Sequence, residues 1–188
     1  MNMWILWNQC WDLNEVDLTP HHLLQHTSSK DIWEHGHKHE HDRFVNWLRP
    51  HPNPASFEVW SLSEKSIISV NRQLDKRIIS KETPTVSLAQ IKFPIKNQPA
   101  QLPPHIDRGR KAAINIYIST GQDVTNFWST SKNNFHVINC FKAQSGQSFL
   151  LDVRQPHSVD LSGHHIRTII TLSFKKMGFS DLAEYNLV

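Results

Sequence analysis

The chain has 188 residues, of which 38% are hydrophobic, and its formal net charge is +3. A length of this order is typical of one domain, so we expect a single domain over residues 1–188. Seven Trp and nine Phe residues supply the bulk of a packed core, which excludes a disordered chain. The mild basic excess falls short of that of a dedicated nucleic-acid binder, which argues against nucleic acid as a partner.

The sequence carries no signal for a membrane or for secretion. No run approaches the ~18 apolar residues that a membrane span needs, and the first basic residue is Lys30, so a charged signal-peptide n-region is missing. Cys10 and Cys140 are too few for a disulfide framework and fit a reducing compartment. We therefore expect a cytoplasmic protein without a membrane partner, with Cys140 as a small core residue of an apolar strand.

Residues 1 to about 60 are polar and rich in His and Trp. We expect residues 1–85 to form a helical and irregular elaboration around the core. Thr19-Pro20 predicts the start of a short helix, because Thr is a good N-cap and Pro fits the first helical position. The segment Ser61-Leu62-Ser63-Glu64 predicts the cap of a second helix that runs toward Arg77.

From about residue 86 the pattern changes to short β-type segments separated by Gly, Asn, Pro and Ser. We expect strands at residues 86–95, 112–119, 135–142, 148–153 and 167–175. Several short strands joined by short turns are typical of an antiparallel sandwich or small barrel. The sequence therefore predicts a mainly β core over residues 86–176, followed by a tail at residues 177–188.

Three residues in this core have the chemistry of a metal site. His105 and Asp107 stand two positions apart in "LPPHIDRGR", and on an extended segment such residues point to the same side. His157 follows 52 residues later in "LLDVRQPHSVD", directly after an expected strand. Two His and one carboxylate form the facial triad of non-haem iron sites, which leaves coordination positions open.

Arg167 stands ten residues after His157 and opens the apolar strand "RTIITLSF". A buried guanidinium needs an anionic partner, and its planar fork suits a carboxylate. A ligand carboxylate is one such partner. A structural ion pair with Asp152 or Asp160 is the alternative.

The segments "LPPHIDRGRKAAINIYI" and "GQSFLLDVRQPHSVDLSGHHIRTIITLSF" resemble the Fe(II)- and 2-oxoglutarate-dependent oxygenases. That resemblance implies a double-stranded β-helix (jelly-roll, cupin-like) core. It implies that His105, Asp107 and His157 hold Fe(II). It also implies that Arg167 binds the distal carboxylate of the cosubstrate 2-oxoglutarate.

Within that superfamily the sequence is most similar to the branch related to aspartyl/asparaginyl β-hydroxylases. There, a polar residue on the strand after the metal motif also contacts the cosubstrate, and Asn115 has the matching place. Tyr117 shares a strand face with Asn115 and would line the same cavity. The alternatives are an Asn115 that satisfies backbone groups of the barrel and a Tyr117 that serves packing alone.

The implied activity is that of a dioxygenase, a hydroxylase that consumes O2 and 2-oxoglutarate and acts on an unidentified small-molecule or peptide substrate. Ile169 stands where many relatives have Ser, which removes one partner of the cosubstrate carboxylate. Ser173 stands where nucleic-acid demethylases have a second Arg, and the presence of Asp107 argues against the related halogenases. The alternatives are a non-catalytic jelly-roll binding module and a cupin-type metalloenzyme that does not use 2-oxoglutarate.

Other conspicuous residues have a plainer interpretation that we favour. The run "HGHKHEHD" at residues 35–42 contains four alternating His residues but no Cys, so a solvated face is favoured over a metal site. For the basic residues after the metal motif, a solvated loop is favoured over steering of an anionic substrate: these are Arg108, Arg110 and Lys111. Trp128 is interpreted as a core aromatic residue rather than a substrate contact.

Overall fold

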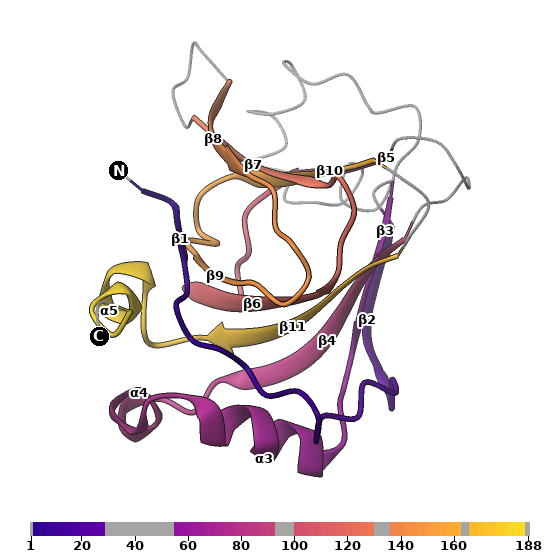
Figure 1. The fold of residues 1–188 in the computed structure, drawn as a ribbon. Helices are drawn as coiled ribbons and strands as arrows, with labels where there is room; N and C mark the ends of the chain where they lie inside the picture. Colours follow the sequence, from indigo (N-terminus) through magenta and orange to yellow (C-terminus); the bar gives the residue numbers. More distant parts are fainter. Residues whose placement is uncertain (1, 29–54, 93–99, 130–135, 163–165, 187–188) are drawn as a thin grey trace.

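The computed structural model describes residues 2–28, 55–92, 100–129, 136–162 and 166–186 (Figure 1). Its strands form two antiparallel sheets, one with the order β1-β9-β6-β11-β4-β3-β2 and one with the order β5-β10-β7-β8. The strands are β1 (Trp4–Leu6), β2 (Leu23–Ser28), β3 (Ser56–Trp60), β4 (Thr85–Lys92), β5 (Ala100–His105), β6 (Ala112–Ser119), β7 (Val124–Trp128), β8 (Val137–Phe141), β9 (Ser148–Leu151), β10 (His157–Leu161) and β11 (Arg167–Phe174). The helices are α3 (Glu64–Gln73), α4 (Lys76–Lys81) and α5 (Phe179–Ala183).

The eight strands from β4 to β11 form a jelly roll. Strands β4, β6, β9 and β11 lie side by side in the larger sheet, and β5, β7, β8 and β10 make up the smaller one. The chain therefore passes repeatedly from one sheet to the other, as the double Greek key of a jelly roll requires. Figure 1 shows the smaller sheet above the larger one. The expected mainly β, double-stranded β-helix fold is confirmed.

The larger sheet buries a different set of side chains on each face, because successive side chains of a strand point to opposite faces. On β11, Ile170 and Leu172 belong to the cluster that packs against the three helices. Ile169 belongs to the cluster between the sheets, with Tyr117 of β6 and Phe127 of β7. Residues of β11 with odd numbers thus face the interior of the jelly roll, and the candidate residue Arg167 is one of them.

The described part of residues 1–85 contains three strands that extend the larger sheet at both edges, which the expectation of a helical and irregular segment did not include. Strand β1 pairs with β9, whereas β3 pairs with β4 and β2 with β3. The helix expected after Thr19-Pro20 is wrong. The backbone there continues the pairing with the end of β3, since His21 donates to the Ser61 carbonyl (3.1 Å) and Ser61 to the His22 carbonyl (2.8 Å).

The helix expected to run from Ser63 toward Arg77 is confirmed at its start and divided in two at Asp75. The Ser63 side chain caps α3 by accepting from the backbone N–H of Ser66 at 3.2 Å. The Asp75 carboxylate accepts from the backbone N–H of Arg77 at 2.7 Å and so caps α4. An Asp side chain competes for backbone donors in this way, which favours a helix start over a helix interior.

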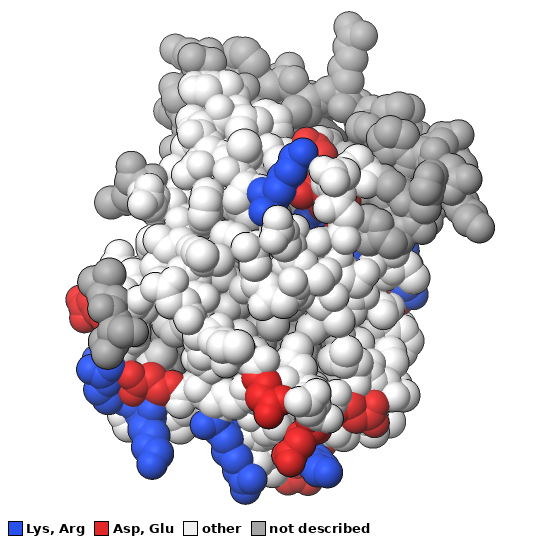
Figure 2. Space-filling model, viewed as in Figure 1, with Lys and Arg blue, Asp and Glu red and all other residues white. Residues whose placement is uncertain are grey.

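Charged side chains gather on the lower part of the face in Figure 2, at the level of α3 and α4 in Figure 1. This is the solvent side of helices whose other side packs on the larger sheet. None of the helices in the described ranges has the length and hydropathy that crossing a membrane requires. Cys140 was expected in the core but is exposed, because it alternates with the buried Phe141 on β8, the edge strand of the smaller sheet.

Candidate metal centre

Two paired strands of the smaller sheet bring the expected metal ligands together. His105 is the last residue of β5 and His157 the first of β10, and the two are direct partners in the antiparallel register. Asp107 follows two residues after β5, and its backbone N–H donates to the Val153 carbonyl at 3.0 Å. Residues that are far apart in the sequence therefore meet at one end of the smaller sheet.

The possible ligand atoms of His105, Asp107 and His157 all lie within 4.8 Å of one another. The His105 Nε2 atom is 3.8 Å from Asp107 Oδ1, and the His157 Nε2 atom is 3.9 Å from Asp107 Oδ2. Ligand atoms held about 2.1 Å from one ion at right angles lie about 3 Å apart. An inward shift of about 1 Å would bring the set to metal-binding distances, so the donor set fits a divalent metal ion.

Backbone carbonyls fix the tautomer of both imidazoles. His105 Nδ1 lies 2.8 Å from the Pro103 carbonyl oxygen, and His157 Nδ1 lies 2.9 Å from the Gln155 carbonyl oxygen. A carbonyl oxygen only accepts, so each Nδ1 carries the proton and donates it. The Nε2 lone pair of each ring is then free for a metal, an arrangement typical of ligating histidines.

The charge state of the carboxylate is set by its neighbours. Burial alone would raise the pKa of the Asp107 carboxyl, but the Arg110 guanidinium and the two imidazoles outweigh burial and hold that pKa well below its usual range. Asp107 is therefore ionised near neutral pH and brings one negative charge to the site.

Burial lowers the pKa of His157 to about 4. The neighbouring His105 and Arg110 act in the same direction, whereas Asp107 and the hydrogen bond to the Gln155 carbonyl oppose it. His157 is therefore neutral near pH 7, as a metal ligand must be.

Arg110 contacts the metal site, which the expectation of a solvated loop missed. Its Nε and Nη2 donate to Asp107 Oδ2 at 3.0 and 2.7 Å. Its Nη1 donates to the hydroxyls of Thr171 and Ser173 at 2.8 and 2.9 Å. The sequence spacing placed Arg110 three residues from Asp107, but the partners on β11 could not be inferred from it.

Arg167 lies between the two sheets and is only 2% exposed. Its Nη2 donates to the Tyr117 hydroxyl at 3.2 Å and to the Thr125 hydroxyl at 2.8 Å. Its guanidinium carbon lies 5.0 Å from the centre of the Tyr117 ring, a cation–π distance. Its Nε and Nη1 are buried and have no hydrogen-bond partner among the residues that the structure describes. Three N–H donors of a buried cation are therefore unused.

No carboxylate within the described ranges forms an ion pair with Arg167, so the structural pairing with Asp152 or Asp160 is not supported. The two oxygens of Asp160 accept instead from Gln101 and Asn126, both at 2.7 Å. A buried guanidinium without an anion is costly. The arrangement fits a site whose anion arrives with a ligand.

Two hydroxyls contact Arg167, and strand β6 carries one further buried polar group. The hydroxyls of Tyr117 and Thr125 accept from Arg167, so their own protons remain available for an anionic ligand. Asn115 is 7% exposed and lies opposite Thr171 in the register of β6 and β11. Its Oδ1 has no hydrogen-bond partner within the described part of the chain. Thr125 was missed by the sequence analysis, because β7 was not among the expected strands.

The turn before β9 fixes the strand that carries Tyr117. Gly146 donates to the Tyr117 carbonyl oxygen at 2.7 Å, and the Tyr117 N–H donates to the Gln147 carbonyl at 2.9 Å. Gly146 has a φ of 88°, a conformation that residues with a side chain rarely adopt. The turn thus holds Tyr117 in place through its backbone and leaves the side chain free to meet Arg167.

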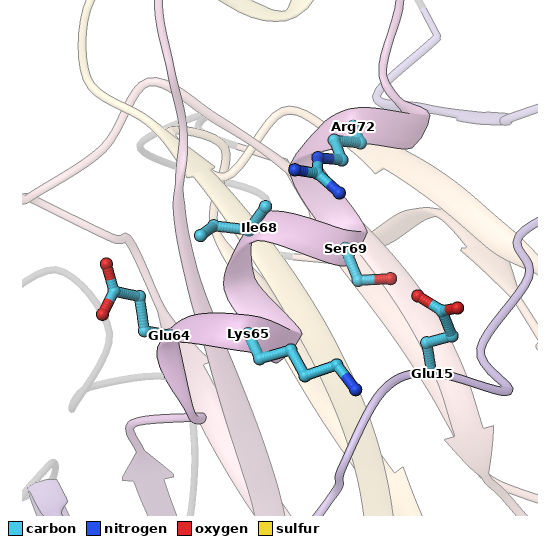
Figure 3. A pocket seen from close by; sticks show the side chains of 6 residues that line it. All are labelled: Glu15, Glu64, Lys65, Ile68, Ser69 and Arg72. Atoms are coloured by element: carbon cyan, nitrogen blue, oxygen red, sulfur yellow. The ribbon is translucent and has the colours of Figure 1, made fainter.

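Three further features are a surface depression beside α3, the Trp128 side chain and the His-rich run. A surface depression of about 340 Å³ lies beside α3 (Figure 3). Six residues line it, and none is an expected site residue: Glu15, Glu64, Lys65, Ile68, Ser69 and Arg72. Trp128 donates from Nε1 to the Ser158 hydroxyl at 2.9 Å. The His-rich run at 35–42 falls outside the described residues.

The fold has distant likeness to solved oxygenase structures. A ribosomal oxygenase from Escherichia coli aligns with a TM-score of 0.44 and 10% identity, over 75% of this chain and 37% of that one. A prolyl-4-hydroxylase from Pseudomonas putida aligns with a TM-score of 0.43 and 14% identity, over 82% of this chain and 92% of that one. No family model and no curated protein matches the sequence. The assignment of residues therefore rests on the geometry of this site alone.

Proposed function

We propose that this protein is an Fe(II)- and 2-oxoglutarate-dependent dioxygenase that hydroxylates an unidentified small-molecule or peptide substrate. One observation carries the proposal. The cation of Arg167 is buried between the sheets with three unused donors, in the same core that ends at the His105, Asp107 and His157 triad. A binding module without turnover has no need of both features.

The separation of the two features supports a small dicarboxylate as the shared ligand. The His157 ring lies 6.0 Å from that of Phe127, which is its partner across β10 and β7. Thr125, which binds Arg167, lies two residues farther along β7, or about 7 Å. A five-carbon diacid is about 5 Å long, from four C–C bonds of about 1.5 Å. One end could reach the metal while the other meets Arg167.

In this proposal each residue has a distinct role. His105, Asp107 and His157 hold the metal and leave the remaining coordination positions open. Arg167, Tyr117 and Thr125 bind and orient the distal carboxylate, and Asn115 offers its amide between the two ends. With Fe(II) held there, O2 would be the oxidant of both 2-oxoglutarate and the substrate: one oxygen atom would enter succinate as CO2 is released, and the other would enter a substrate C–H bond.

The test is a titration of the anaerobic Fe(II) protein with 2-oxoglutarate, followed by the visible metal-to-ligand charge-transfer band. We expect a saturable band in the wild type and none in His157→Ala. Arg167→Met should weaken 2-oxoglutarate binding by at least about 10-fold, because hydrogen bonds to a charged group are worth about 1.5–3 kcal/mol each. Its Fe(II) affinity should stay within about 3-fold. Arg72→Met, at an exposed arginine on α3, is the matched control and should behave as the wild type.

Each contrary result favours one of the alternatives. Fe(II) binding without a band would overturn the use of 2-oxoglutarate and favour a cupin-type metalloenzyme. A protein that binds neither Fe(II) nor 2-oxoglutarate would be a jelly-roll binding module. Equal losses of metal and cosubstrate affinity in Arg167→Met would assign Arg167 a structural role.

A further inference from the structure

Arg110 is held at both ends of its guanidinium group. On one side two N–H groups donate to a single oxygen of Asp107, Oδ2, at 3.0 and 2.7 Å. On the other side Nη1 donates to the hydroxyls of Thr171 and Ser173 at 2.8 and 2.9 Å. Four of the five N–H donors of Arg110 are thus in use. Unlike Arg167, Arg110 has almost no capacity left for a ligand.

The two oxygens of Asp107 are not equivalent as metal ligands. Oδ2 accepts two hydrogen bonds, which occupy the two lone pairs of a carboxylate oxygen. Oδ1 accepts no hydrogen bond from any residue within the described ranges and lies 3.8 Å from the Nε2 of His105. Oδ1 is therefore the oxygen that is free to coordinate.

The two hydroxyls that accept from Nη1 of Arg110 belong to a strand in the middle of the larger sheet. Thr171 and Ser173 are alternate residues of β11, so both face the interior, and β11 is paired on one side with β4 and on the other with β6. A strand in the middle of a sheet moves less than a loop. Asp107 stands in the segment after β5 and is tied through Arg110 to the larger sheet.

We propose that Arg110 is a positioning residue that restricts Asp107 to coordination through one oxygen. This inference rests on the proposed function, because it takes the triad as the metal site. A carboxylate that turned and bound the metal with both oxygens would take one more coordination position. By occupying Oδ2, Arg110 keeps about three positions open, enough for a two-point ligand and O2.

The test is the number of water molecules on Mn(II) bound to the protein, measured from the EPR line broadening in ¹⁷O-enriched water. The wild type should carry about three. Arg110→Met should carry one fewer, because Asp107 becomes free to bind through both oxygens. Arg110→Lys should also carry one fewer, since an ammonium group lacks the planar fork that fills both lone pairs of Oδ2. Lys111→Met removes a neighbouring exposed charge and should keep about three.

The outcomes separate this inference from the proposed function. About three waters in either Arg110 variant, folded and loaded with Mn(II), would overturn the positioning role. If Arg110→Met fails to fold, Arg110→Lys carries the test, because it keeps the charge. Addition of 2-oxoglutarate to the wild type should displace two waters. If it displaces none, the proposed function fails, while the counts in the variants still decide the role of Arg110. A wild type that binds no Mn(II) would defeat the metal site itself.

Discussion

Arg110 and Arg167 have the same side chain and opposite hydrogen-bonding states. Arg110 uses four N–H donors on Asp107, Thr171 and Ser173, so it holds protein groups in place. Arg167 leaves Nε and Nη1 without partners although it is buried. Because a buried cation without an anion is unfavourable, Arg167 makes the ligand-free protein less stable than it could be. A buried residue that lowers the stability of the ligand-free protein is typical of a binding site.

The burial of the unpaired Arg167 guanidinium gives a prediction for stability. Arg167→Met should raise the free energy of unfolding of the ligand-free protein by about 1–2 kcal/mol, because an apolar side chain of similar length replaces the unpaired cation. Urea unfolding without metal or 2-oxoglutarate is the measurement. Arg72→Met, on the exposed side of α3, should change stability by less than about 0.5 kcal/mol. A loss of stability in Arg167→Met would mean that its bonds to Tyr117 and Thr125 outweigh the burial of the charge.

His157 gives a prediction for pH. Burial, with His105 and Arg110, lowers its pKa to about 4 in the folded protein, against 6.5 in an unfolded chain. Between these values the unfolded state binds a proton that the folded state does not, so stability falls as the pH falls. Above pH 6.5 the free energy of unfolding is unaffected by this group. By about pH 4 it has fallen by about 3 kcal/mol.

Urea unfolding of the metal-free protein between pH 7 and 4.5 would measure this loss. His157→Gln removes the titrating group and should reduce the slope of stability against pH in this range. The lowered pKa of Asp107 adds its own loss only at lower pH, near and below the ordinary carboxyl range. An equal slope in wild type and variant would mean that His157 takes up its proton as readily in the folded protein as in the unfolded chain.

At the scale of elements, the strands that the sequence predicted are the ones built from apolar alternation. The segments at 86–95, 112–119, 135–142, 148–153 and 167–175 correspond to β4, β6, β8, β9 and β11. The expectation missed β5, β7 and β10. Strand β5 contains Pro103 and Pro104, which lack N–H donors. It can hold them because β5 lies at the edge of the smaller sheet as described, with β10 as its neighbour.

Strands β7 and β10 were missed for a different reason. Both strands contain polar residues at positions that alternate with the core residues. Asp160 of β10 and Asn126 of β7 bond to each other at 2.7 Å, and Trp128 bonds to Ser158 in the same way at 2.9 Å. Cross-strand hydrogen bonds thus stabilise these strands in place of apolar burial. Such partners are fixed by the register of the sheet, which local sequence does not give.

Because local sequence does not give partners from other strands, only some residues of the candidate site were predicted. His105, Asp107, His157 and Arg167 could be inferred from spacing and from their positions next to strands. Arg110 and Thr125 could not, because their roles depend on partners from other strands: Arg110 on β11, and Thr125 on Arg167. Spacing identifies residues with reactive chemistry, whereas the residues that hold them are identified only by the tertiary contacts.

At the scale of the whole molecule, the proposed site takes residues from both sheets. His105, His157 and Thr125 belong to the smaller sheet, and Arg167, Asn115 and Tyr117 to the larger one. A ligand that contacts both sets connects the two sheets. Its binding energy therefore adds to the stability of the entire fold rather than of one loop.

This arrangement predicts that metal and 2-oxoglutarate stabilise the protein together. At a ligand concentration of 100 times its Kd, each should add about 2.7 kcal/mol to the free energy of unfolding. The increment from a fixed concentration of 2-oxoglutarate should be larger with Mn(II) than without, because the metal supplies one of its two anchors and the coupling is reciprocal. Calorimetric unfolding with each ligand alone and with both would measure it. Arg167→Met should keep the Mn(II) increment and lose most of the 2-oxoglutarate increment. If that increment were the same with and without Mn(II), 2-oxoglutarate would bind away from the triad.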